Sequence, residues 1–262
     1  MTTLFRQWTR SNRENSPGIK SSCLTTHYLP PWKRSIDLAC CLLALPILAL
    51  FTLVMSVITK LIAPGPVFFR QERVGCMGRR FKIYKFRTML VGADTVVHRD
   101  HFQELVRSNA PMAKLDSRGD SRLIIGGRLL RASGLDELPQ IINVLKGEMS
   151  IVGPRPCLPT EFAAYQQPQR FRCAAMPGLT GLWQVSGKNR TTFQEMIQLD
   201  IQYTETKSPL LDLRIILMTI PTLVRQMRES RARRPAGPDG KSSRREAEDR
   251  ARLIGRARTQ HR

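Results

Sequence analysis

The sequence predicts a mostly α-helical monotopic membrane protein with a small β-hairpin, a re-entrant N-terminal helix broken at a proline, and one cytoplasmic domain. Three observations predict this fold. Residues 38–58 form a run of 21 uncharged residues that contains Pro46, and basic residues lie on both sides of the run. Further on, two segments rich in aromatic and β-branched residues have the pattern of a hairpin. Apolar residues in the later segments recur at helical spacing.

The chain has 262 residues, enough for one domain with its own core but too few for two large domains. We expect a basic N-terminal segment at 1–32, a membrane helix at 33–62, the main domain at 63–227 and a basic disordered tail at 228–262. The net charge of +21 indicates an acidic partner, which is compatible with nucleic acid, anionic lipid or a phosphate-bearing substrate. Nucleic acid is disfavoured, because the chain has an apolar run and no recognised reader motif.

The uncharged run is long enough to cross a bilayer, since 21 helical residues rise about 30 Å. Two features favour a re-entrant helix over a straight span. Pro46 removes a backbone hydrogen bond and bends the helix. Positive residues favour the cytoplasmic side, so a single span would force one basic group outside. The flanking basic residues are Arg6, Arg10, Arg13, Lys20, Lys33 and Arg34 before the run, and Lys60, Arg70, Arg73, Arg79 and Arg80 after it.

A β-hairpin is predicted directly after the membrane run. Residues 66–70 and 81–88 are rich in aromatic and β-branched residues, and glycines lie between them. Alternation in the second strand places Lys85 and Arg87 on one face, where two cations can meet an anion. The alternative is that both side chains are simply solvated.

A helix is predicted within residues 133–147, because apolar residues recur at i, i+3, i+4 and i+7 and a glycine follows. Asp136, Gln140 and Asn143 fall within about 40° of one another on the opposite face. Pro139 is tolerated only in a first turn, which places Asp136 and Glu137 at the helix start, where backbone N–H groups favour ionised carboxylates. On their own, such acids are most often helix caps.

The neighbouring residues favour a phosphate site instead. Arg131 precedes the acid pair, and residues 151–156 (IVGPRP) form a loop whose prolines and glycine fix the backbone around Arg155. A rigidly held arginine suits bidentate phosphate binding. Residues 177–181 (PGLTG) form a second rigid loop. Together these residues describe a metal-assisted phosphoryl-transfer site. The apolar segment 210–227 is expected to pack on the core, with the membrane plane as the alternative.

The motifs in this order resemble the bacterial monotopic phosphoglycosyl transferases, the sugar transferases that start polysaccharide repeat units, and in particular their short exopolysaccharide-type members. The matching stretches are KRSID at 33–37, FKIYKFRTM at 81–89, LDELPQ at 135–140, NVLKGEMSIVGPRP at 143–156 and PGLTGLWQVSG at 177–187. Together they are highly specific, and they lie within residues 33–227.

The resemblance implies that 63–227 is a catalytic domain on the cytoplasmic face of the bacterial inner membrane. Asp136 would attack a UDP-sugar, release UMP and carry the phosphosugar covalently until undecaprenyl phosphate takes it. Mg²⁺ is expected at Asp136, and Glu137 would handle metal or protons. Substrate-binding positions are assigned to Lys85, Arg87, Arg131, Gln140 and Arg155. A homodimer is also compatible with this assignment.

The chain departs from the family at Met176, where an arginine usually stands, and we consider Arg172 or Lys188 as replacements. The WQVSG stretch favours a glucose or galactose donor. The competing hypothesis is a non-catalytic basic membrane protein that recruits or regulates a polysaccharide assembly complex, with the acid pair acting only as a helix cap.

Overall fold

The computed structural model describes residues 29–61, 64–90, 108, 110–111, 123–124 and 126–232. The expected basic N-terminal segment and tail lie almost wholly outside these residues. The chain divides into two compact units, Met1–Met227 and Arg228–Arg262, and the architecture below is that of the first. Its described part is mostly helical, with two small two-stranded sheets.

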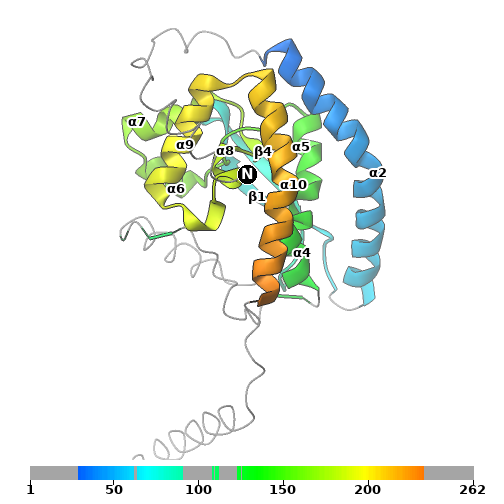
Figure 1. Ribbon diagram of the computed structural model, residues 1–262. Coiled ribbons are helices and arrows are strands. Elements are labelled where there is room, and N and C mark those ends of the chain that lie inside the picture. The colour runs from blue at the N-terminus through cyan, green and yellow to red at the C-terminus, as the bar shows by residue number, and fades with distance from the viewer. Residues whose placement is uncertain are drawn as a thin grey trace, which may run out of the picture. The chain divides into compact units, whose positions relative to one another are not determined.

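Helix α2, Pro31–Leu61, contains the uncharged run. Pro46 lies inside it, and the helix continues through the proline, curving along the outside of the body (Figure 1). The prediction of a break at Pro46 was therefore wrong in this respect. The hydroxyls of Thr52 and Ser56 donate to the carbonyls of Leu48 and Thr52, so they need no water in an apolar environment. Among the described helices, α2 alone is long and apolar enough to cross a bilayer.

Both ends of α2 are packed against the same body. Near its start, the Lys33 ammonium donates to Asp212 Oδ2 at 2.6 Å and to the hydroxyl of Tyr203 at 2.8 Å, all three side chains being buried. Near its end, Met55 packs in a second apolar cluster with Phe86. The buried face of the helix consists of Lys33, Asp37, Cys41, Leu48, Met55 and Thr59.

The predicted hairpin is confirmed. Strands β1, Phe68–Val74, and β2, Arg80–Phe86, pair antiparallel with Phe69 opposite Lys85. The first strand lies closer to the turn than predicted, because Met77 and Gly78 adopt positive φ angles of 53° and 78° and reverse the chain only there. The second strand ends at Phe86.

The predicted helix at 133–147 is divided by a change of helix type. Helix α4, Gly127–Ser133, ends at Gly134, whose φ of +75° suits glycine. A 3₁₀ helix, η4 (Leu135–Gln140), then continues into α5, Ile141–Leu145. Asp136 and Glu137 lie in the first turn of η4, as predicted for a helix start.

The two motif loops form a parallel sheet that the sequence pattern does not indicate. Strand β3, Ser150–Val152, pairs with β4, Gly178–Thr180. A Cβ on Gly153 would lie 2.1 Å from the carbonyl oxygen of Met176, and one on Gly178 would lie 2.0 Å from the nitrogen of Gly153. Only glycine permits this approach. The interpretation of both stretches as loops was wrong for these residues.

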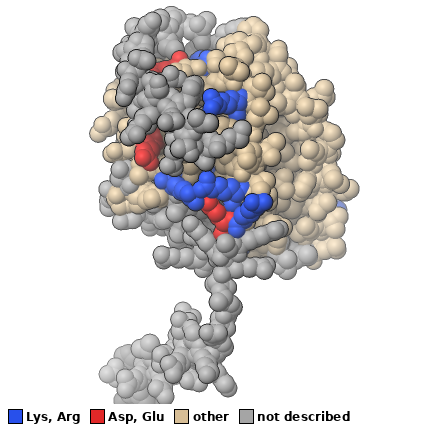
Figure 2. Space-filling model, in the orientation of Figure 1, with Lys and Arg blue, Asp and Glu red and all other residues tan. Residues whose placement is uncertain are grey.

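Short helices complete the domain: α6 (Pro159–Ala164), α7 (Gln167–Arg170), η5 (Phe171–Ala174), α8 (Leu182–Val185) and η6 (Lys188–Arg190). Two longer helices, α9 (Phe193–Thr206) and α10 (Pro209–Ala232), follow. Helix α10 buries Leu211 and Ile215 in the core, as expected, but exposes an apolar stripe of Leu210, Leu213, Leu217, Ile220 and Val224. Figure 2 shows that the outer side of α2 is almost free of charged side chains, whereas charged side chains lie in the central part of the face shown.

Candidate active site

Asp136 and Glu137 lie where η4 begins, directly after Gly134. The side chain of Asp136 is nearly buried, with 8% of the residue exposed. Strand β2 packs along η4, which brings Lys85 to the acid pair: its Nζ donates to Glu137 Oε1 at 2.6 Å. The anion that Lys85 was predicted to meet is thus supplied in this structure by the protein itself. Lys85 therefore contacts Glu137, one of the two candidate catalytic carboxylates.

Arg87 takes a different direction. Because β2 ends at Phe86, the alternation on which the prediction relied does not extend to Arg87. The guanidinium donates from Nη1 to the carbonyl oxygen of Pro64 at 3.2 Å, in the loop after α2, and the residue is 6% exposed. This hydrogen bond of Arg87 is thus to the loop after α2, whereas the hydrogen bond of Lys85 is to Glu137.

The helical spacing of Asp136, Gln140 and Asn143 predicted a polar face, and in the structure this face packs against the hairpin. Asn143 is fully buried; its Oδ1 accepts from the backbone N–H of Tyr84 at 3.1 Å and its Nδ2 donates to the carbonyl of Lys82 at 2.8 Å. Gln140 is also buried on this helix. Because Lys82 and Tyr84 lie in the same strand as Lys85, Asn143 ties that strand to α5, which directly follows η4.

Arg155 lies in the turn after β3, and its backbone is held on both sides. Its N–H donates to Asp200 Oδ2 at 3.3 Å, and its carbonyl accepts from Arg172 Nη2 at 3.0 Å. Its side chain, about a quarter exposed, donates to Glu161 Oε2 at 3.3 Å. The predicted rigid arginine is present, and the rigidity comes from tertiary hydrogen bonds as well as from prolines.

Arg172 does not replace the family arginine at Met176. It is fully buried, and its guanidinium pairs with Asp200 and donates to the hydroxyl of Tyr165 at 2.7 Å. An anion in solution cannot reach it. The other suggested replacement, Lys188, donates from Nζ to Gln226 Oε1 at 3.3 Å. Arg131 lies in the last turn of α4, shortly before Asp136.

Arg73 is a site residue that the sequence interpretation missed. Burial, and after it the nearby charge of Arg155, lowers the pKa of Arg73 to about 10, whereas Glu161 and Glu137 act in the opposite direction. Arg73 therefore lies within electrostatic range of Glu137 and of Arg155. Its Nη1 donates to the carbonyl of Pro156 at 3.3 Å, which ties β1 to the turn after β3.

The signal that could have revealed Arg73 is the register of the hairpin. Arg73 faces Phe81 and Lys85 faces Phe69, and alternate positions along each strand share a face. Arg73 and Lys85 thus project from the same face of the sheet. That inference requires the position of the turn, which the sequence pattern does not locate closely enough.

The carboxylates fit a magnesium ion of the substrate-bridging kind. No group of three or more His, Cys, Asp or Glu residues able to hold a metal occurs within the part of the chain that the structure describes. Mg²⁺ usually needs only one or two carboxylates, together with waters and substrate phosphates. Asp136 would hold such an ion, with Glu137 next to it in the first turn of η4.

Residues 28–226 match the family model of the bacterial sugar transferases. The chain is 41% identical over 198 residues to the exopolysaccharide production protein ExoY of Sinorhizobium fredii, covering 73% of this chain and 84% of that protein. It is 38% identical over 200 residues to the UDP-glucose:undecaprenyl-phosphate glucose-1-phosphate transferase of Caulobacter vibrioides, covering 73% and 69%. It is 34% identical over 201 residues to the undecaprenyl-phosphate galactose phosphotransferase of Salmonella typhimurium, covering 74% and 40%. The predicted resemblance is confirmed, and the chain belongs to the bacterial sugar transferase family.

Proposed function

We propose that this sugar transferase moves a sugar-1-phosphate from a UDP-sugar to undecaprenyl phosphate, releases UMP and thereby starts the assembly of an exopolysaccharide or another glycan. The observation that carries the proposal is the nearly buried Asp136 beside the Lys85–Glu137 ion pair, in a family whose relatives are named for this reaction. A carboxylate that is shielded from water in this way is suited to act as a nucleophile on phosphorus.

The reaction would proceed in two displacements. A carboxylate oxygen of Asp136 attacks the phosphorus that bears the sugar, the bond to the bridging oxygen breaks, and UMP leaves with that electron pair. A phosphate oxygen of undecaprenyl phosphate then attacks the same phosphorus and displaces the aspartate, giving a lipid diphosphate sugar. Covalent catalysis of this kind divides one difficult transfer into two easier steps.

The cations near Asp136 would neutralise the diphosphate. Lys85 and Arg73 project from one face of the hairpin, and Arg155 lies within electrostatic range of Arg73. Fixed positive charges of this kind stabilise charge that develops on phosphate oxygens during transfer. A magnesium ion bound at Asp136 would reduce repulsion between carboxylate and diphosphate. Glu137, held by Lys85, would handle protons or complete the metal site.

The docking of α2 supports a monotopic arrangement in the inner membrane, with the domain on the cytoplasmic face. A straight span would carry one end of a 31-residue helix about 45 Å away from the other, across the bilayer. Here Lys33 near one end and Thr59 near the other are both buried against the domain. A curved helix that enters one leaflet satisfies this packing and leaves its outer apolar face to lipid.

Purified protein incubated with UDP-sugars, Mg²⁺ and a polyprenyl phosphate tests the proposal. We expect UMP release and a lipid-linked product with UDP-glucose or UDP-galactose. Asp136→Asn should abolish turnover and trapping of the phosphosugar, whereas the exposed acid Glu205, changed to Gln, serves as a control with normal activity. Absence of UMP with every common UDP-sugar would favour the non-catalytic hypothesis. Full activity of the Asp136→Asn variant would show that Asp136 is not the nucleophile.

A further inference from the structure

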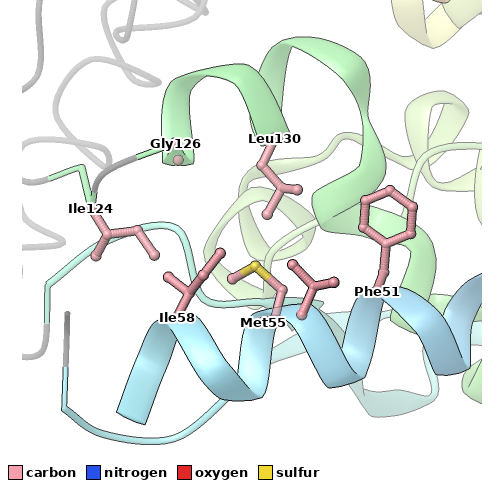
Figure 3. Close-up of a pocket in the computed structure, with 8 residues that line it drawn as sticks. Phe51, Met55, Ile58, Ile124, Gly126 and Leu130 are labelled. Atoms are coloured by element: carbon pink, nitrogen blue, oxygen red, sulfur yellow. The ribbon is translucent and has the colours of Figure 1, made fainter. Parts of the chain in front are cut away.

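An apolar pocket lies between the second half of α2 and the start of α4. Its cavity volume is about 90 Å³, which is room for a short piece of a ligand and not for a whole one. Figure 3 shows Phe51, Met55 and Ile58 on α2 facing Leu130 of α4 and Ile124 across the hollow. The lining is Phe51, Val54, Met55, Ile58, Ile124, Gly126, Gly127 and Leu130, without a polar side chain.

The chemistry of this lining selects the kind of ligand. A pocket without hydrogen-bonding side chains cannot fix a sugar, a nucleotide or a lipid headgroup, because their polar groups would lose water without compensation. It suits a hydrocarbon chain. Its rim continues onto the outer face of α2, since the lining residue Val54 is 46% exposed and its neighbour Leu53, which faces outward, is 64% exposed. A chain that lies along α2 can therefore enter from the lipid side.

The pocket is also connected to the candidate nucleophile. Leu130 and Phe51, two of its walls, pack in the same apolar cluster as Leu138, two residues after Asp136. Helix α4 has seven residues and is about 10 Å long; its first residues line the pocket and its end leads through Gly134 to Asp136. A chain seated in the pocket can therefore present a terminal phosphate towards the acid pair.

We propose that this pocket holds the first isoprene units of the polyprenyl phosphate acceptor and so sets the position of its phosphate at Asp136. The inference rests on the proposed function, since the acceptor is taken from it. It assigns acceptor recognition to side chains of α2 and α4. It also gives α2 a second role besides anchoring, because the helix supplies half of the pocket wall.

Two pairs of neighbouring residues provide matched variants. Val54→Trp and Leu130→Trp fill the pocket, whereas Leu53→Trp and Leu129→Trp place the same side chain at exposed adjacent positions. At saturating UDP-sugar, the pocket variants should raise the KM for a long-chain polyprenyl phosphate about tenfold, because they exclude hydrocarbon from an apolar site. UMP release in a single turnover without acceptor should stay within about twofold of wild type for all four variants, since the donor step does not use the pocket.

Acceptor binding measured without donor separates this inference from the proposed function. Radiolabelled polyprenyl phosphate should bind wild type and both control variants in detergent, and bind the pocket variants about tenfold more weakly. Excess phospholipid should not displace it. Equal binding by Val54→Trp and Leu53→Trp would overturn the pocket assignment, and so would equal displacement by phospholipid. Failure of UMP release with intact, pocket-dependent binding would count against the transfer reaction alone. If Leu130→Trp fails to fold, the half-exposed Val54 still carries the test.

Discussion

Arg172 and Asp200 form a buried ion pair that holds the backbone of Arg155 between them. Arg172 donates to the carbonyl of Arg155, and Asp200 accepts from its N–H. Neither residue of the pair reaches solvent. The pair therefore acts on the candidate phosphate site through the position of Arg155, and its members are positioning residues.

Arg172→Gln should weaken use of the donor by releasing Arg155. We expect the KM for the UDP-sugar to rise about tenfold or more, and the protein to lose about 3–5 kcal/mol of unfolding free energy, because Asp200 is left buried without its partner. Steady-state kinetics of Arg172→Gln, Arg155→Ala and the double variant check this. The double variant should be no worse in KM than Arg155→Ala, since both changes remove one function. Additive losses would contradict the positioning role, and the exposed Arg170, changed to Gln, is the control.

Because Asp200 is buried, we expect the free energy of unfolding and the use of the donor to change in opposite directions as pH rises. Burial raises its pKa from 3.8 to about 6, although Arg172 favours the ionised form. The folded state then binds the proton more tightly than the unfolded chain, so this group's contribution to stability is greatest below pH 3.8 and falls by about 3 kcal/mol as pH rises through 6. Ionised Asp200 is needed to hold Arg155, so donor use should improve over the same range.

The measurement is the unfolding free energy and kcat/KM for the UDP-sugar between pH 4 and 8, for wild type and Asp200→Asn. The asparagine cannot titrate, so the difference in stability between the two proteins should change with pH near 6 and be flat above 7. A difference that is constant across the whole range would show that Asp200 keeps an ordinary pKa.

The elements around Asp136 are predictable because their signals are local. Helical periodicity, the acid pair at a first turn and the terminating Gly147 all lie within one short segment, and the structure shows a helical run there. The surroundings of that run are not predictable from the pattern. Helical periodicity places Asn143 on the same face as Asp136, but it cannot show that strand β2 covers this face.

The residues that were missed depend on contacts between distant segments. The pairing of β3 with β4 requires Gly153 and Gly178 to meet backbone to backbone, and a glycine in sequence signals only that a close approach is permitted. Arg73 appeared only as a basic residue flanking the membrane run. Its place near Arg155 follows from the hairpin register and from the hydrogen bond to Pro156.

The effects of substituting Lys85 and Glu137 on catalysis should be energetically coupled, because the two side chains are in contact. Lys85→Met removes the ion pair with Glu137 and one positive charge from the site, so we expect the KM for the donor to rise and kcat to fall, together about 100-fold in kcat/KM. Glu137→Gln should have a smaller effect on the donor KM, because Lys85 then remains free to meet the diphosphate.

A double-variant cycle on Lys85 and Glu137 separates a functional contact from a surface pair. The partly exposed pair should contribute less than about 1 kcal/mol to unfolding free energy, whereas its coupling energy in kcat/KM should exceed that value. Coupling that appears in stability but not in kcat/KM would assign the pair to the fold only. The exposed pair of Arg80 with Glu72, 3.6 Å apart on the same hairpin, is the matched control.

The docking of α2 predicts that both of its ends lie on the cytoplasmic side of the membrane. Ser35 and Lys60 are exposed near the two ends, so each can be replaced by cysteine in a variant that lacks the native cysteines. A membrane-impermeant maleimide should label neither position in intact spheroplasts and both after lysis, because Lys33 and Thr59 tie each end to one domain. Arg80→Cys, on the hairpin, reports the side on which the domain lies. Labelling of one end of α2 from outside and of the other only after lysis would show a true span, and the helix would then have to leave the domain surface on which it is packed here.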